Sequence, residues 1–272
     1  MSTQQSVIAV LSGKGGVGKT TISAGLGCVY AALGLKVLII DMDMGLRNLD
    51  LQFQVQGDIL FDLSHVLDGY LPLSEAIISV PQHPNLSILA SSLQKNFSSI
   101  DPEQIKTMMN HATDLFDIVI LDAPAGADPL LLEIVHYCDA ALLVSHPYLP
   151  SLRSVDKLLG MLSKNLPKYW VINRMPTTIL STQQKNYLKD VDFPLCGSVP
   201  EIPDLLAYQA ENQPLSHKGF FKALYPIALV LINQKQTQDE QISLDDDKEI
   251  AKIPQAKSHK KWKDFIANFA LW

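Results

Sequence analysis

A lysine and a threonine stand side by side at the end of a glycine-rich stretch near the start of the chain. Glycines let successive backbone N–H groups point at phosphate oxygens, Lys19 is spaced to reach the outer phosphates, and the Thr20 hydroxyl can join a Mg²⁺ shell. The motif G-x-x-x-x-G-K-[S/T] is completed by Gly13, Gly18, Lys19 and Thr20. The candidate contacts of this phosphate-binding loop are Gly13, Lys14, Gly15, Gly16, Val17, Gly18, Lys19, Thr20 and Thr21.

Carboxylates follow two apolar runs that read as buried strands. The run 36–41 ends in Asp41, and Asp43 comes two residues later, so both carboxylates can face one magnesium–phosphate centre. The run 117–122 ends in Asp122, which has the form of a Walker B acid that lies near Mg²⁺ through water. The pattern predicts that these acids meet the glycine-rich stretch at one site.

Apolar strands alternate with helical patterns along the chain, and this alternation indicates how the site is positioned. A strand at 7–11 leads into the glycine-rich stretch and a helix at 20–33 leads out of it, which makes the motif specific. Continuous apolar strands predict an α/β doubly wound, mostly parallel sheet with helices on both faces and ligands at the carboxyl ends of the strands. The other expected strands are 36–41, 86–90, 117–122, 140–145, 169–173 and 195–199, and the other expected helices are 102–115, 130–137, 152–162, 182–189, 202–209 and 219–232.

The composition excludes several classes of protein. A chain of 272 residues with 47% apolar residues suits one large α/β domain plus an appendage. No run of about eighteen apolar residues and no signal-peptide pattern occur, so we expect a cytoplasmic protein. The net charge of −6 argues against a nonspecific DNA binder. Cys28, Cys138 and Cys196 form no C-x-x-C pair, which argues against structural zinc.

A second lysine in the loop, Lys14, distinguishes this stretch from an ordinary phosphate-binding loop. The sequence K-G-G-V-G-K-T at 14–20 resembles the deviant loop of the ParA/MinD family of P-loop ATPases. In that family the early lysine contacts the phosphates of the nucleotide held by the partner subunit. The resemblance therefore implies ATP as the ligand, a homodimer formed on ATP binding, and a catalytic role in trans for Lys14.

Two more segments resemble the switch regions of this family. The segment 41–50, D-M-D-M-G-L-R-N-L-D, is similar to switch I of its MinD branch, where Asp43 would position or activate the attacking water and Asp41 would act in the magnesium shell. The segment 122–126, D-A-P-A-G, resembles switch II with Ala123 in place of serine, and would move with the γ-phosphate. The implied catalytic residues are Lys14, Lys19 and Asp43, and the implied ligands of Mg²⁺ are Thr20, Asp41 and Asp122.

Two stretches near the end of the predicted sheet resemble family segments that border the base. Asn173 and Arg174 end an apolar strand, and the resemblance implies that Asn173 pairs with the base edge while Arg174 stacks on it or contacts phosphate. The stretch 197–201, G-S-V-P-E, is similar to the family's G-x-I-P-E/D and adds Pro200 and Glu201 as contacts. Together these resemblances define an ATPase domain over 1–232.

Beyond residue 232 the apolar periodicity fades, which predicts a flexible polar linker over 233–259. An amphipathic helix is expected over 260–272, with lysines in its first turn and one apolar face that suits an anionic lipid surface. The family resemblance agrees, so we expect the protein to lie peripherally on the cytoplasmic face of the inner membrane. The residues of the apolar face are Trp262, Phe265, Ile266, Phe269 and Trp272.

The resemblance implies a MinD-like ATPase whose dimerisation and reversible membrane binding regulate the position of cell division. MinC-like and MinE-like proteins would be its partners, and no specific nucleic acid is expected. Two alternatives keep the ATPase: a FlhG-like regulator of flagellar number and placement, and a ParA-type DNA-partitioning ATPase, which needs a basic surface. The cysteine spacing opposes a metal-cluster carrier of the same superfamily. The non-enzymatic alternative is a scaffold that binds ATP but barely hydrolyses it.

Overall fold

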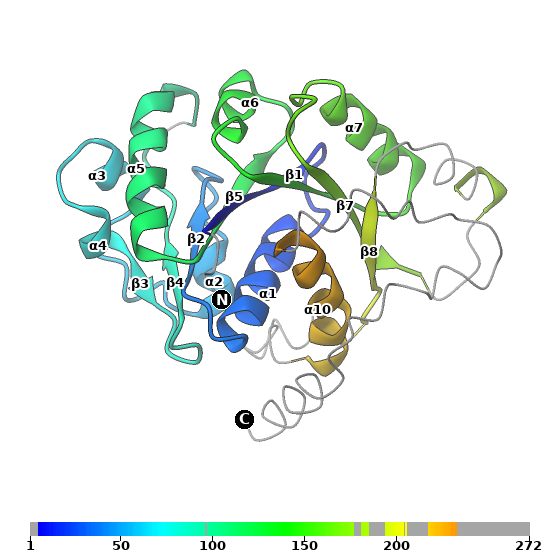
Figure 1. Cartoon of the computed structure of the whole chain (residues 1–272), viewed down its shortest axis with the longest axis horizontal. Helices are drawn as coiled ribbons and strands as arrows, with labels where there is room; N and C mark the ends of the chain where they lie inside the picture. The colour runs from blue at the N-terminus through cyan, green and yellow to red at the C-terminus, as the bar shows by residue number, and fades with distance from the viewer. Residues whose placement is uncertain are drawn as a thin grey trace.

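The computed structural model describes residues 5–95, 97–176, 181–184, 194–203, 205 and 217–232. Its strands form one sheet in the order β3-β4-β2-β5-β1-β6-β7-β8 (Figure 1). Neighbouring strands run parallel except at one edge, where β3 is antiparallel to β4. The strands are β1 (Ser6–Ser12), β2 (Val37–Asp41), β3 (Ile78–Ser79), β4 (Leu86–Leu89), β5 (Ile118–Ala125), β6 (Ala140–Ser145), β7 (Lys168–Met175) and β8 (Leu195–Pro200).

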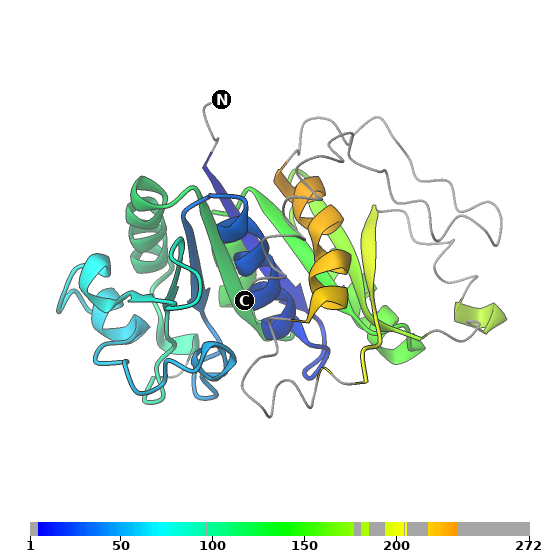
Figure 2. The same ribbon diagram turned by 90° about the horizontal axis from the view of Figure 1, so that it is seen from below.

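Helices cover both faces of the sheet, which confirms the predicted doubly wound architecture. α1 and α10 lie side by side on one face, and α5, α6 and α7 cover the other face (Figures 1 and 2). The helices are α1 (Lys19–Ala32), α2 (Leu49–Phe53), α3 (Leu63–Leu67), α4 (Leu73–Ala76), α5 (Pro102–Leu115), α6 (Pro129–Val135), α7 (Leu149–Leu159) and α10 (Lys218–Ile232), with a 3-10 turn at Phe97–Ser99.

The central strand β1 contributes to two separate hydrophobic cores. Ile8 and Val10 face the core under α1 and α10, while Ala9 and Leu11 face the core under α5, α6 and α7. Side chains alternate between the two faces of a strand, so a strand covered on both faces reads as a continuous apolar run. This burial on both sides explains the uninterrupted apolar sequence from which the strand was predicted.

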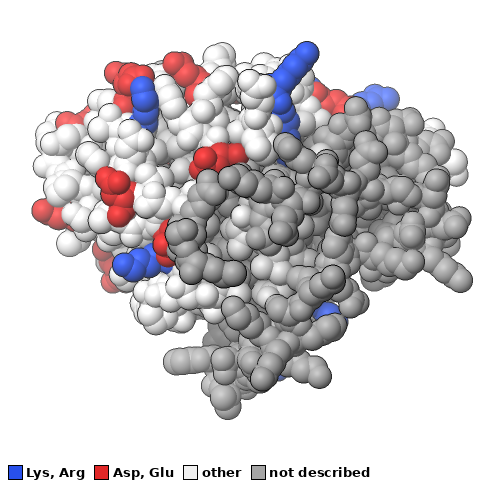
Figure 3. Space-filling view, in the orientation of Figure 1, with Lys and Arg blue, Asp and Glu red and all other residues white. Residues whose placement is uncertain are grey.

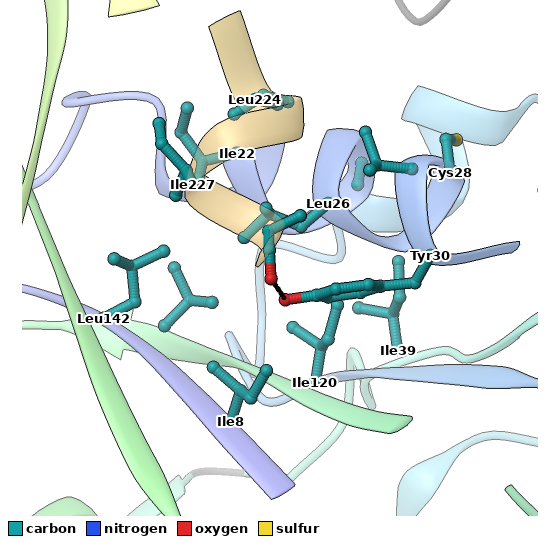
Figure 4. Packing of buried hydrophobic residues seen from close by; sticks show 14 of the residues in the cluster. Ile8, Ile22, Leu26, Cys28, Tyr30, Ile39, Ile120, Leu142, Leu224 and Ile227 are labelled. Carbon is teal, nitrogen blue, oxygen red and sulfur yellow. Dashed lines mark hydrogen bonds between the residues drawn. The ribbon is translucent and has the colours of Figure 1, made fainter. Parts of the chain in front are cut away.

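Helix α10 is held closely against α1. The Tyr30 hydroxyl donates a buried hydrogen bond of 3.0 Å to the Ala228 carbonyl of α10 (Figure 4). Gly25 of α1 faces the same helix, and a Cβ at this position would overlap Leu224 and Phe220. The missing side chain permits the close approach of the two helices, so α1 is held against both the sheet and α10.

The structure corrects the predicted bounds of several elements. β5 continues through Ala125, three residues beyond the expected strand end at Asp122, because Ala125 still pairs with Ser12 of β1. β7 likewise continues past Asn173 to Met175. The helix expected at 152–162 instead begins at Leu149, because its second residue is a proline, which suits the first turn of a helix.

The region between β2 and β4 holds elements that were not predicted. The helices α2, α3 and α4 and the antiparallel strand β3 all lie there. Most of the expected helices 182–189 and 202–209 lies outside the described residues, as do the expected linker at 233–259 and the expected helix at 260–272.

Candidate functional site

The glycine-rich loop joins the carboxyl end of β1 to the first turn of α1. Gly16 and Gly18 have φ angles of 76° and 87°, a left-handed conformation that glycine adopts without strain. Gly18 is the N-cap residue of α1, so the positive end of the helix dipole opens into the loop. The Val17 side chain is buried and anchors the loop, while Lys14 is exposed.

Lys19 is bound to Asp122 beneath the loop. Its ammonium lies 3.1 Å from Asp122 Oδ1, with Lys19 6% exposed and Asp122 fully buried. The Ser23 hydroxyl donates a hydrogen bond of 2.9 Å to the same oxygen. Asp122 Oδ2 is buried and has no hydrogen-bond partner among the described residues. The predicted loop lysine and the predicted Walker B acid therefore meet, as the sequence suggested.

The Asp41 carboxylate accepts hydrogen bonds from the backbone of the segment that follows β2. Its Oδ1 accepts the N–H of Asp43 at 2.9 Å, and its Oδ2 accepts the N–H of Leu49 at 3.1 Å. Burial, and then the neighbouring Asp122 carboxylate, raise the pKa of Asp41 to about 7, although these two backbone hydrogen bonds act to lower it. The carboxylate thus holds both ends of a short loop, a role that the sequence pattern did not indicate.

Asp43 lies half-buried beside this cluster. Burial raises the pKa of the Asp43 carboxyl, the Lys19 ammonium lowers it, and the Asp122 carboxylate raises it. The Asp43 carbonyl accepts a hydrogen bond of 3.1 Å from the hydroxyl of Ser91, which lies just after β4. The side chain is therefore set near the loop lysine by fixed backbone contacts on both sides.

The residues present suit a magnesium ion. Three carboxylates, those of Asp41, Asp43 and Asp122, surround one buried lysine, and the buried Asp122 Oδ2 has a free acceptor site. Mg²⁺ prefers oxygen ligands and keeps several of its waters, so a carboxylate that contacts the metal through water fits this oxygen. Thr20, at the second position of α1, is half-buried at the same end of the helix. The predicted metal set of Thr20, Asp41 and Asp122 remains a prediction.

The residues predicted to border the base lie at the carboxyl ends of β7 and β8. Asn173 is 6% exposed, and its Nδ2 donates a hydrogen bond of 2.9 Å to the Val17 carbonyl of the loop. Arg174, Pro200 and Glu201 are exposed at the carboxyl ends of these strands, which is the edge where the loop lies. The structure brings all four residues to this edge, and their contacts with a base stay predictions.

His146, which the sequence analysis did not select, also lies at this edge. It directly follows β6, and its Nε2 is buried without a hydrogen-bond partner among the described residues. Burial lowers the pKa of His146, as do the nearby charges of Arg174 and Lys14, whereas Glu201 raises it. The charged groups of Arg174, Glu201 and Lys14 therefore lie close enough to His146 to act on its pKa. The position at the carboxyl end of a predicted strand was the signal that could have identified His146.

None of the described helices combines the length and apolar character that a membrane crossing requires.

Comparison with family models gives a match of residues 8–215 to the CobQ/CobB/MinD/ParA nucleotide binding domain. The septum site-determining protein MinD of Helicobacter pylori is 31% identical over 222 residues, which cover 77% of this chain and 83% of the relative.

Two solved structures share the fold and about a quarter of the aligned residues. The MinC:MinD cell division protein complex of Aquifex aeolicus matches with a TM-score of 0.74 and 28% identity, over 89% of this chain and 98% of the matched chain. The septum site-determining protein MinD of Pyrococcus horikoshii, complexed with Mg-ADP, matches with a TM-score of 0.72 and 25% identity, over 86% of this chain and 98% of that one.

Proposed function

Because this chain belongs to the CobQ/CobB/MinD/ParA nucleotide-binding family, we infer that it is a MinD-like ATPase that takes part in placing the site of cell division. The observation that carries this inference is the buried contact between Lys19 and Asp122 beneath the glycine-rich loop. A lysine and an acid in these positions serve the phosphates and the Mg²⁺ of a bound nucleotide. ATP is the substrate, and Mg²⁺ is the metal that accompanies it.

Different residues of this chain bind the phosphates, bind the metal and orient the attacking water. Lys19 and the loop N–H groups bind the phosphates and orient them, and Thr20 and Asp122 would hold the magnesium ion that neutralises phosphate charge. Asp43 orients the attacking water, whose oxygen bonds to the γ-phosphorus as the bond to the leaving oxygen of ADP breaks. The raised pKa of Asp43 suits a group that takes up a proton from this water.

Two subunits close face to face when both hold ATP. Lys14 supports this arrangement because it is exposed at the tip of the loop and free to reach beyond its own subunit. Its ammonium contacts the phosphates of the partner subunit's nucleotide and stabilises the charge that develops there. A MinC-like protein binds the ATP-loaded dimer, and a MinE-like protein stimulates its hydrolysis.

Membrane attachment depends on the segment 260–272. Its sequence combines lysines with an apolar aromatic face, and one such short helix binds a lipid surface weakly. Two copies on a dimer bind far more tightly because the second contact is intramolecular. The ATP state therefore controls attachment to the cytoplasmic face of the inner membrane.

The alternatives receive less support. The relatives named above are septum site-determining or cell division proteins, which favours a role in division over flagellar placement. A DNA-partitioning ATPase needs a basic surface. On the described part of the face in Figure 3, lysines and arginines are scattered among acidic side chains and form no broad patch.

The ATPase is tested by measuring phosphate release and sedimentation of the full chain with ATP and Mg²⁺, with ADP, and without nucleotide. We expect hydrolysis that requires Mg²⁺ and a dimer that forms with ATP alone. Binding of ATP without any turnover over many hours, with or without a MinE-like protein, would instead identify the non-enzymatic scaffold.

The membrane segment is tested separately by co-sedimentation with anionic liposomes. The full chain is expected to bind in the presence of ATP, and a chain truncated after residue 259 is expected to stay in solution. Equal ATP-dependent binding by the two forms would refute the role of 260–272 and leave the ATPase assignment intact.

A further inference from the structure

Asn173 contacts the phosphate-binding loop from a strand far away in the sequence. Its Nδ2 donates to the Val17 carbonyl at 2.9 Å, and its Oδ1 accepts the N–H of Arg174 at 3.0 Å. The two contacts fix the orientation of the amide, because a flipped amide would place an oxygen against the Val17 carbonyl and hydrogens against an N–H. The amide therefore bridges the end of β7 and the loop in one orientation.

The backbone around Asn173 is shaped to allow this bridge. Arg174 adopts a φ of 54°, a conformation that non-glycine residues rarely occupy and that is found where surrounding contacts enforce it. The pairing of β7 with β8 is irregular between Ile172 and Met175, the same short interval. The unusual φ and the irregular pairing therefore both occur at the residue whose N–H binds the Asn173 amide, so the strand end departs from regular geometry beside the amide.

The loop is shaped to receive the amide as well. A Cβ at Gly18 would overlap Asn173 Nδ2, so the close contact requires glycine at this position. Val17 is buried, and its carbonyl therefore needs a partner inside the protein. Asn173 supplies that partner, which means that Gly18 and Asn173 are matched to one another across the site.

We propose that Asn173 is a positioning residue for phosphate binding, which it serves by orienting the peptide between Val17 and Gly18. In a trans peptide the C=O and the following N–H point in opposite directions, and the described chain contains no cis peptide. A hydrogen bond that draws the Val17 carbonyl toward β7 therefore directs the Gly18 N–H away from β7, into the anion-binding loop. This role rests on the proposed nucleotide binding and is distinct from reading the base.

The proposal makes a prediction that base recognition does not make. Loss of the Asn173 amide weakens binding of any ligand that carries the phosphate chain, with or without a base. Removing one such hydrogen bond corresponds to a loss of affinity of about three- to tenfold. If Asn173 acted only on the base, a phosphate chain without a base would bind to the variant as it binds to the wild type.

The experiment measures KM and kcat for ATP, and the inhibition constant of inorganic tripolyphosphate, for wild type, Asn173→Ala and Asn173→Asp. We expect both the KM and the inhibition constant to rise by a similar factor in Asn173→Ala, with a smaller change in kcat. Asn173→Asp retains the acceptor for Arg174 but places an oxygen against the Val17 carbonyl, so its affinities should fall further. Asn165→Ala, at an exposed position before β7, is the matched control and should leave both constants unchanged.

The outcomes separate the possibilities. If Asn173→Ala raises the KM for ATP but leaves the inhibition constant of tripolyphosphate unchanged, the proposal is overturned. It is also overturned if neither constant changes in this variant. A generally damaged fold would lower kcat and the unfolding temperature without a parallel change in both constants, so thermal unfolding is recorded for each variant. Failure of the wild-type chain to bind ATP would overturn the proposed function rather than this role of Asn173.

Discussion

The ammonium of Lys19 and a carboxylate oxygen of Asp122 lie 3.1 Å apart in a buried contact between the start of α1 and the middle of the sheet. The phosphates of a nucleotide must therefore compete with Asp122 for the charge of the loop lysine. Removing one partner of a buried ion pair leaves the other charge without compensation, which costs far more than the pair itself contributes. The pair thus couples nucleotide binding to the stability of the fold.

Lys19→Ala should lose ATP binding and also destabilise the protein by about 3 kcal/mol, because Asp122 is left buried without its cation. Adding Asp122→Asn removes the uncompensated charge, so the double variant should recover much of the stability without recovering ATP binding. Denaturant titration at pH 7 and ATP-binding measurements check the two effects separately. A double variant no more stable than Lys19→Ala would show that the ion pair does not carry the stability.

Lys14→Ala should bind ATP with nearly normal affinity but fail to form the ATP-dependent dimer, because the lysine acts on the partner subunit's nucleotide. Lys36→Ala, at the opposite end of the sheet, is the control and should dimerise normally. Sedimentation with ATP measures the dimer for both. A dimer of Lys14→Ala as tight as that of wild type, with normal stimulated turnover, would rule out action in trans.

Asp43→Ala should bind ATP and retain the dimer, but its single-turnover hydrolysis should fall by a factor of about 100 or more, the usual effect of losing a group that handles the proton. Asp58→Ala, an exposed site beyond α2, serves as the control. Rapid mixing with labelled ATP measures the chemical step without product release. Hydrolysis by Asp43→Ala at the wild-type rate would remove this residue from the mechanism.

His146 should make stability fall as the pH drops below about 6.5, its ordinary pKa. Burial and the charges of Arg174 and Lys14 lower the pKa of His146 in the folded state, so between the lowered and the ordinary value the unfolded chain binds a proton that the folded chain does not. Stability therefore rises with pH through this window and is retained above it.

Denaturant titrations between pH 5 and 8 compare wild type with His146→Gln, which cannot titrate. The difference in unfolding free energy between the two should change with pH below 6.5 and become constant above it. His111→Gln, at an exposed position of α5, is the control for replacing a histidine at a surface site. A constant difference between wild type and His146→Gln across the whole range would contradict the lowered pKa.

Much of the fold could be predicted because β1, β2 and β6 are buried on both faces and carry unbroken apolar runs. The ends of strands were less predictable, since apolar sequence stops at Asp122 whereas backbone pairing of β5 with β1 continues to Ala125. Pairing depends on a neighbouring strand that a local pattern does not contain. The same limitation placed Asn173 at a strand end, when β7 runs past it.

The short helices α2, α3 and α4 were missed because four or five residues cannot display a helical period. Helices of this length are unstable alone, and these form because Leu49, Phe53 and Leu63 are buried against the larger elements. The residues of the predicted motifs lie at the carboxyl ends of the strands, where the sequence pattern placed the ligand. The contacts of Asp41 and Asn173 were not foreseen, because each joins backbone groups that only the folded chain brings together.

The contact between Gly25 and the side chains of α10 has a consequence for the order of events during translation. The glycine-rich loop is synthesised early, but β1 gains its neighbouring strands only when β5 and β6 exist. Helix α1 gains its neighbouring helix only when residues 218–232 have been made. Such distant pairings form slowly and only after the intervening chain exists. A nascent chain therefore carries the complete loop sequence long before it can bind ATP, and the nucleotide first meets this site when nearly the whole domain has been synthesised.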